Sequence, residues 1–220
     1  MEQEVITELT AAAQWLNTTF AEFDAAITVG VHKLHEIAPG FFTPFMEFIS
    51  LLGKGGIFLI ILSLALLFFK KTRRYGTAMC IGLALGALFV NLYLKVVVAR
   101  PRPYADESSI FYQLWTLVGQ HTESDKSFPS GHTNATFAAM VPIFLLGDKR
   151  RSWLALLFAV LMGVSRIYLC VHYPTDVIGG AITGTIAGII GTVIALKLPD
   201  AWYEWEIKQK KGRHERVHVR

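Results

Sequence analysis

The stretch from Val177 to Leu196 reads VIGGAITGTIAGIIGTVIAL and contains no charged residue over 20 positions. A run of about 18 or more apolar residues is typical of a transmembrane helix. Gly180, Gly184 and Gly188 recur at four-residue spacing, so they share one helix face and let a second helix approach closely. The stretch therefore predicts a membrane-spanning helix that packs tightly against a neighbour.

Four more stretches are nearly free of charge: Gly56–Phe69, Gly76–Leu94, Thr133–Gly147 and Trp153–Val164. Over all 220 residues, 53% are hydrophobic and only 17% are charged, and the mean hydropathy is +0.42. A soluble domain carries roughly 25% charged residues. This composition excludes a disordered chain and argues against an ordinary soluble domain. We predict an all-α fold, a polytopic membrane helix bundle of five to six transmembrane helices.

Basic residues mark one side of this predicted bundle. Lys70–Arg74 follows Gly56–Phe69, Lys149–Arg151 precedes Trp153–Val164, and a basic tail follows Leu196. Simple alternation of the spans places these three segments on one side, and the positive-inside rule assigns that side to the cytoplasm. We therefore expect a multi-pass protein of the cell membrane with a cytoplasmic C-terminus. A tail of this kind is expected to contact anionic lipid rather than nucleic acid.

The first forty residues have a different pattern, in which apolar residues recur at helical spacing. These apolar positions are Val5, Leu9, Ala12, Leu16, Phe20, Phe23, Ile27, Val31 and Leu34. The opposite face holds Glu2, Glu4, Glu8, Gln14, Asn17 and Asp24. We predict N-terminal amphipathic helices in residues 1–40, a membrane-embedded core in residues 41–198 and a basic cytoplasmic tail in residues 199–220. A sixth span within Phe20–Leu52 is the alternative for the N-terminal part.

Ionisable side chains cluster at the span ends on the other, extracytoplasmic side. They are Lys95, Arg100 and Arg102 in KVVVARPRP, His132 after Ser130 and Gly131, Arg166 after Ser165, and His172 and Asp176. Ionisable groups at membrane depth are costly, and they are functional by default. Arginine forms bidentate bonds with phosphate oxygens, lysine adds a point charge, and a helix N-terminus offers backbone N–H groups to an anion. The cluster therefore predicts a phosphate cradle.

Two histidines in the same cluster have side chains that can catalyse phosphoryl transfer. His172 and Asp176 are four residues apart with Pro174 between them, which suits a helix that starts there. Asp176 can then reach one ring nitrogen of His172, fix its tautomer and leave the other nitrogen to attack phosphorus. His132 comes from a different span and can protonate the leaving oxygen. This mechanism needs no metal, and no cluster of acidic residues and histidines has two-metal spacing.

Three motifs carry a resemblance to a known family. Lys95-x6-Arg102-Pro103, Pro129-Ser130-Gly131-His132 and Ser165-Arg166-x5-His172-x3-Asp176 resemble the signatures of the type-2 phosphatidic acid phosphatase superfamily. That family includes membrane lipid phosphatases, glucose-6-phosphatase and vanadium haloperoxidases, and the resemblance covers Gly53–Leu196.

The resemblance implies a role for each matching position. It makes His172 the nucleophile that forms a phosphohistidine, Asp176 its orienting carboxylate and His132 the general acid. The implied phosphate-binding residues are Lys95, Arg102, Ser130, Gly131 and Arg166, with weaker support from Arg100 and Ser165. No metal and no cofactor are implied.

We therefore expect an integral membrane phosphatase acting on a lipid phosphate in the bilayer, with its active site on the extracytoplasmic face. By resemblance to bacterial members, the expected substrate is undecaprenyl diphosphate or phosphatidylglycerophosphate. A lipid phosphotransferase that uses the same residues is the alternative enzyme, and a lipid transporter is the alternative from another class. The sequence indicates no oligomeric state.

Overall fold

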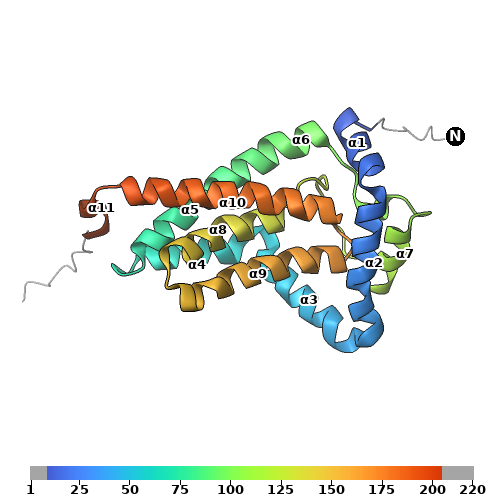
Figure 1. The fold of residues 1–220 in the computed structure, drawn as a ribbon, viewed down its shortest axis with the longest axis horizontal. Coiled ribbons are helices and arrows are strands. Elements are labelled where there is room, and N and C mark those ends of the chain that lie inside the picture. Colours follow the sequence, from blue (N-terminus) through green and yellow to red (C-terminus); the bar gives the residue numbers. More distant parts are fainter. Residues whose placement is uncertain (1–8, 205–220) are drawn as a thin grey trace, which may run out of the picture.

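The computed structural model describes residues 9–204, and the regular structure within this range is entirely helical. The all-α prediction is thus confirmed. Five helices lie side by side in a bundle (Figure 1): α4 (Ile57–Leu67), α5 (Arg73–Ala87), α8 (Gly131–Leu146), α9 (Lys149–Tyr168) and α10 (Pro174–Lys197). Their core contains the buried side chains Leu59, Met79, Leu83, Ala139, Met140 and Ala159.

Shorter helices flank the bundle or extend its members. They are α1 (Ala11–Thr19), α2 (Ala21–Ile37), α3 (Pro39–Gly53), η1 (Lys54–Gly56), the π-helical η2 (Leu88–Leu94), α6 (Lys95–Val98), η3 (Pro103–Ala105), α7 (Ile110–Leu117) and α11 (Asp200–Glu204). In Figure 1, α2 runs across one end of the bundle, near α1 and α7, and α11 lies at the opposite end.

Four segments of the described residues are long and apolar enough to cross a membrane: Pro39–Leu67, Arg73–Ala105, α9 and α10. The predicted count of five to six is therefore not confirmed. The predicted span Thr133–Gly147 falls in α8, which has only 16 residues. At 1.5 Å per residue α8 is about 24 Å long, which is less than the roughly 30 Å of a hydrocarbon core. It packs among α5, α9 and α10.

The alternative of a separate sixth span within Phe20–Leu52 is not what the structure shows. Helix α3 continues through η1 into α4, and Pro39–Leu67 forms one candidate span. The chain changes direction at Gly55 and Gly56, whose φ angles are 60° and 68°. Glycine adopts these left-handed angles without steric cost, so α3 and α4 are two helices joined at a kink within this one candidate span.

The predicted close packing of the glycine face on α10 is confirmed. A Cβ atom added to Gly180 would lie 2.6 Å from the carbonyl oxygen of Ser130, and one added to Gly184 would lie 2.3 Å from that of Asn134. At Gly188 the added atom would lie 3.0 Å from the Cβ of Val141. These glycines let α10 approach α8 closely along its length, and this contact holds the start of each helix beside the other.

The N-terminal amphipathic assignment is not confirmed, because α2 buries the opposite face. Its buried side chains are Asp24, Thr28 and His32, whereas Phe23 and Ile27 are 43% and 41% exposed. The physical reason is that the first part of α2 covers a buried cation, Arg100, so that Phe23 and Ile27 point outward. Further along the helix, Val31 and Leu34 do pack against a buried cluster that includes Tyr168. Predicted positions Glu2, Glu4, Val5 and Glu8, and residues 205–220 of the basic tail, lie outside the described residues.

The two ends of the bundle differ in chemistry. The turns that carry Lys70–Arg74 and Lys149–Arg151 lie at the end where α10 leads into α11 (Figure 1). The starts of α8 and α10 and the end of α9 lie at the opposite end, beneath α2. Because these termini carry the second and third motifs, the bundle gathers the residues of both motifs at a single end.

Candidate active site

A cavity of about 460 Å³ opens at the end of the bundle where the motifs meet. Its polar wall contains five of the eight predicted site residues: Lys95, Arg102, Gly131, His132 and His172. The other three, Ser130, Arg166 and Asp176, are at most 3% exposed and stand behind this wall. The structure thus brings together side chains from three separate motifs.

Local structure explains how α8 presents its first residues. Ser130 is the N-cap of the helix, and its hydroxyl accepts hydrogen bonds from the backbone and side chain of Thr133. The backbone N–H of Ser130 donates to the Asp176 carbonyl at 3.0 Å, which ties the start of α8 to the start of α10. His132 then packs over Gly53, where an added Cβ would lie 2.8 Å from the imidazole Cδ2.

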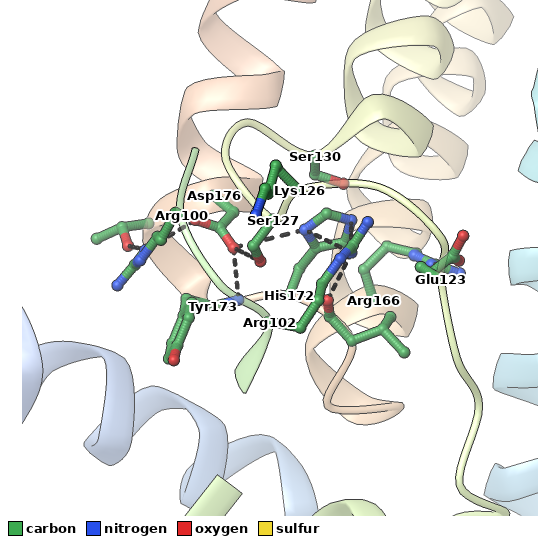
Figure 2. A network of polar contacts seen from close by, with 12 residues as sticks. Arg100, Arg102, Glu123, Lys126, Ser127, Ser130, Arg166, His172, Tyr173 and Asp176 are labelled. Atoms are coloured by element: carbon green, nitrogen blue, oxygen red, sulfur yellow. Dashed lines mark hydrogen bonds and ion pairs between the residues drawn. The ribbon is translucent and has the colours of Figure 1, made fainter. Parts of the chain in front are cut away.

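Arg102 lies directly against His172. Its Nη1 donates to the Val171 carbonyl at 2.7 Å and lies 2.9 Å from Nε2 of His172 (Figure 2). Its Nη2 pairs with the carboxylate of Asp125. The guanidinium is therefore fixed in the cavity wall, beside the ring nitrogen that faces the cavity.

The His172 ring is held from its other side by Asp176, as the four-residue spacing predicted. Nδ1 lies 3.5 Å from Oδ2 of Asp176, and both side chains are almost fully buried. Asp176 also accepts hydrogen bonds from the Ser127 hydroxyl and from the Tyr173 backbone N–H at 3.0 Å (Figure 2). With a proton on Nδ1 facing this carboxylate, Nε2 carries the lone pair, and it accepts the hydrogen bond from Nη1 of Arg102 that a reacting phosphate would displace.

The electrostatic surroundings favour the neutral form of this imidazole. Burial lowers the pKa of His172 well below its ordinary value, and the positive charges of Arg102, Arg166 and Lys95 lower it further. Asp125 opposes this effect without reversing it. At neutral pH the ring is therefore uncharged, which is the state that a nucleophile requires.

Two carboxylates that the sequence reasoning missed contact the predicted phosphate ligands. Asp125 pairs with both Lys95 and Arg102, and Glu123 pairs with Arg166. Burial acts to raise the pKa of Asp125, but its contacts with Lys95 and Arg102 together lower it. Asp125 thus remains a carboxylate at neutral pH and neutralises part of the cradle.

Arg166 is the most enclosed of the three cations and has a free donor. It is 3% exposed, and its terminal nitrogens contact the Ser50 hydroxyl and the Glu123 carboxylate. Its buried Nε has no hydrogen-bond partner among the described residues. Buried donors are rarely left unpaired in native proteins, so this atom is available to a ligand oxygen.

No three histidine, cysteine, aspartate or glutamate side chains within residues 9–204 cluster as potential metal ligands. The absence of a metal requirement remains a prediction.

A helix bundle with four apolar candidate spans and a cationic cavity that holds two histidines has the features expected of a membrane protein that binds a phosphate group. Comparison with known protein families agrees: the PAP2 superfamily model matches residues 72–199, and the chain belongs to this superfamily. The predicted family resemblance is thus confirmed.

Individual relatives point in the same direction. An undecaprenyl-diphosphatase of Sulfolobus acidocaldarius is 31% identical over 140 residues, which are 64% of each chain. Undecaprenyl-diphosphatase BcrC of Bacillus subtilis is 29% identical over 58% of this chain and 62% of its own. The chain thus spans slightly under two thirds of the length of these curated relatives.

A crystal structure shares the architecture over a larger part of the chain. The PAP2-type phosphatidylglycerolphosphate phosphatase of Bacillus subtilis superposes with a TM-score of 0.65 at 26% identity, covering 86% of this chain and 92% of the other. The similarity therefore extends beyond the segment that the family model matches.

Proposed function

We propose that this protein is an integral membrane phosphatase that hydrolyses a lipid phosphate or diphosphate through a phosphohistidine at His172, without a metal. The names of the relatives support undecaprenyl diphosphate or phosphatidylglycerophosphate as the substrate.

The observation that carries this proposal is the two-part lining of the cavity. Its polar end holds Lys95, Arg102, His132 and His172. The same cavity continues along apolar side chains of the bundle, which include Ile60 of α4, Leu83 and Ala87 of α5 and Val90 of η2. A site with this lining fits an amphiphile, whose phosphate binds the cations while its hydrocarbon lies along the apolar wall.

The chemistry balances with the residues present. Nε2 of His172 attacks phosphorus, and the bond from phosphorus to the leaving oxygen breaks. Burial and the charge of Arg166 lower the pKa of His132 to about 2, so the negative charge of the bound phosphate has to raise this pKa before His132, in its protonated form, donates a proton to the leaving oxygen. His132 then takes a proton from water, whose oxygen attacks the phosphohistidine. The phosphorus–nitrogen bond breaks, and inorganic phosphate and neutral His172 result. Lys95, Arg102 and Arg166 stabilise the charge that builds up on the phosphoryl oxygens.

We place the active site on the extracytoplasmic face and the C-terminus in the cytoplasm. The distribution of charge supports this orientation, because Lys70–Arg74 and Lys149–Arg151 lie at the bundle end opposite the cavity. Residues 41–198 then form the phosphatase core.

The direct test is phosphate release by the detergent-purified full chain in excess EDTA. The substrates are undecaprenyl diphosphate, phosphatidylglycerophosphate and phosphatidic acid. We expect release from at least one of them at a rate that EDTA does not change, and the ratio of kcat/KM values ranks the substrates. Loss of activity in EDTA that Mg²⁺ restores would contradict the metal-free mechanism.

The products separate hydrolysis from the alternatives. Hydrolysis yields free phosphate, whereas a phosphotransferase yields a newly phosphorylated acceptor lipid. A folded protein that releases no phosphate and phosphorylates no acceptor lipid would contradict an enzymatic role and leave lipid transport as the candidate function.

A second prediction concerns the carboxylate in the cradle. The Asp125 carboxylate forms ion pairs with Lys95 and Arg102, and it therefore competes with a phosphate group for these two cations. We expect Asp125→Asn to tighten the binding of vanadate by about two- to fivefold, the worth of a partly exposed ion pair. Inhibition constants for vanadate in the native protein and the variant provide the measurement.

The control is Glu107→Gln, which removes an exposed carboxylate from the same external segment. It should leave vanadate inhibition unchanged. Weaker vanadate binding in Asp125→Asn would show that Asp125 supports the cradle instead of competing with the ligand.

A further inference from the structure

A buried ion triad lies behind His172, on the side away from the cavity. Arg100 is 1% exposed and stands between two carboxylates, Asp24 and Asp176, which are 1% and 0% exposed. Its Nη2 lies 2.9 Å from Oδ2 of Asp24, and its Nη1 lies 2.7 Å from Oδ1 of Asp176. Figure 2 shows Arg100 on the far side of Asp176 from His172.

All three guanidinium nitrogens of Arg100 have protein partners. Besides the two carboxylates, Nη1 donates to the Thr175 hydroxyl at 2.7 Å and Nε donates to Oδ1 of Asn17 at 2.8 Å. The guanidinium carbon also lies 3.7 Å from the centre of the Tyr173 ring. Unlike Arg166, Arg100 has no free nitrogen for a phosphate oxygen, so its contacts act on Asp176.

Besides Arg100, Asp24 contacts Thr175 through both of its carboxylate oxygens. Its Oδ1 accepts a hydrogen bond from the Thr175 backbone N–H at 2.9 Å, and its Oδ2 accepts one from the Thr175 hydroxyl at 2.8 Å. Thr175 is in the first turn of α10, next to Asp176. A side chain of α2 thus holds the helix turn that carries the carboxylate partner of His172.

The net charge of the triad affects the chemistry of His172. A buried carboxylate needs a counter-charge to stay ionised, and Arg100 supplies one to Asp176. Arg100 and Asp176 alone would be a neutral pair. Asp24 adds a second negative charge, so the triad has a net charge of −1 beside His172. When His172 forms a bond to phosphorus its ring becomes cationic, and this negative charge then balances it.

We propose that Asp24 and Arg100 are positioning residues for Asp176, and that helix α2 thereby completes the active site. The inference rests on the proposed function, since it assigns the triad to the His172 nucleophile. Asp24 lies outside residues 72–199, the segment matched by the family model. The site therefore depends on a part of the chain that the three motifs do not include.

The test begins with Asp24→Asn in the full chain, which removes the charge and keeps the shape. We expect kcat to fall by about 10- to 100-fold, the loss found where a partner that orients a metal-ligating side chain is removed. Vanadate inhibition should change by less than about threefold, because Asp24 touches none of Lys95, Arg102 and Arg166. The matched control is Glu22→Gln, an exposed carboxylate on the same helix, which should keep the native kcat.

A second-site variant separates charge from structure. Asn17 of α1 already accepts a hydrogen bond from Arg100, and adding Asn17→Asp to Asp24→Asn returns a carboxylate to the same guanidinium from another helix. We expect the double variant to recover at least half of the lost kcat on a logarithmic scale. If Asp24→Asn alone fails to fold, the double variant replaces it in the test. In that case we expect the double variant to fold and to retain turnover.

Each result has a defined meaning. Native kcat in Asp24→Asn, a parallel loss of kcat and vanadate affinity, or a folded double variant without recovery would each overturn the inference. Failure of the proposed function would look different: the native protein itself would release no phosphate from any lipid.

Discussion

Replacing His172 with alanine is expected to abolish phosphate release from the lipid substrate, with a loss of about 10⁴-fold or more. Within the cavity, His172 combines a neutral ring, an orienting carboxylate at 3.5 Å and a second nitrogen directed at the cradle. Without this ring no covalent intermediate forms at this position, and the cations alone supply only electrostatic stabilisation. The variant should still bind vanadate, since the three cradle cations remain.

Two measurements check this prediction. Steady-state phosphate release gives the loss in kcat, and acid-labile labelled phosphate on the quenched protein reports the phosphohistidine. The native protein should trap label and His172→Ala should not. If labelled phosphate is still trapped on His172→Ala, the nucleophile is His132, the other histidine that lines the cavity. Normal turnover would remove His172 from the mechanism.

His121→Ala provides the matched control. His121 is another histidine at the same end of the molecule, but it is partly exposed and contacts Glu47 at 2.9 Å. Its replacement should keep kcat within about threefold, as expected for a surface side chain away from the reacting atoms.

The membrane bundle could be predicted from sequence because its signals are local. Uncharged stretches mark the helices, and the spacing of Gly180, Gly184 and Gly188 predicted the close approach of α10, which the structure shows against α8. The motif residues Lys95, Arg102, His132 and His172 also meet as expected, since span ends on the same side of a bundle lie near one another. The 16-residue length of α8 could also be anticipated, because the uncharged run Thr133–Gly147 is itself shorter than the roughly 18 residues typical of a span.

The partners of the buried cations could not be predicted in this way. Asp24 is 76 residues from Arg100, and its place on a helical pattern indicated a solvent-facing side. That expectation holds for a helix on a soluble protein, whereas α2 has a buried guanidinium beneath it and turns its polar side inward. Glu123 and Asp125 lie in an irregular segment, where no periodicity shows which way a side chain points. A buried arginine requires a partner, and this requirement was the one signal in the sequence that pointed to an acidic residue near Arg100.

Replacing Arg166 with alanine is expected to lower kcat/KM by about 10³-fold, in the range found for arginines that stabilise a phosphoryl transition state. Arg166 is 3% exposed, and its Nε has no partner among residues 9–204, so the guanidinium has a donor to offer a ligand oxygen. Arg166→Lys should recover little, because a single ammonium group cannot keep the contacts with Ser50 and Glu123 and also place a donor where Nε lies.

The control for Arg166 is Arg151→Ala, an exposed arginine near the start of the same helix, at the bundle end away from the cavity. It should retain native kcat/KM. Vanadate inhibition decides between two roles of Arg166. If the side chain binds phosphate, vanadate affinity falls together with kcat/KM, and added guanidinium restores part of both in Arg166→Ala. If vanadate affinity stays native while the protein melts at a lower temperature, Arg166 acts only as the structural partner of Glu123.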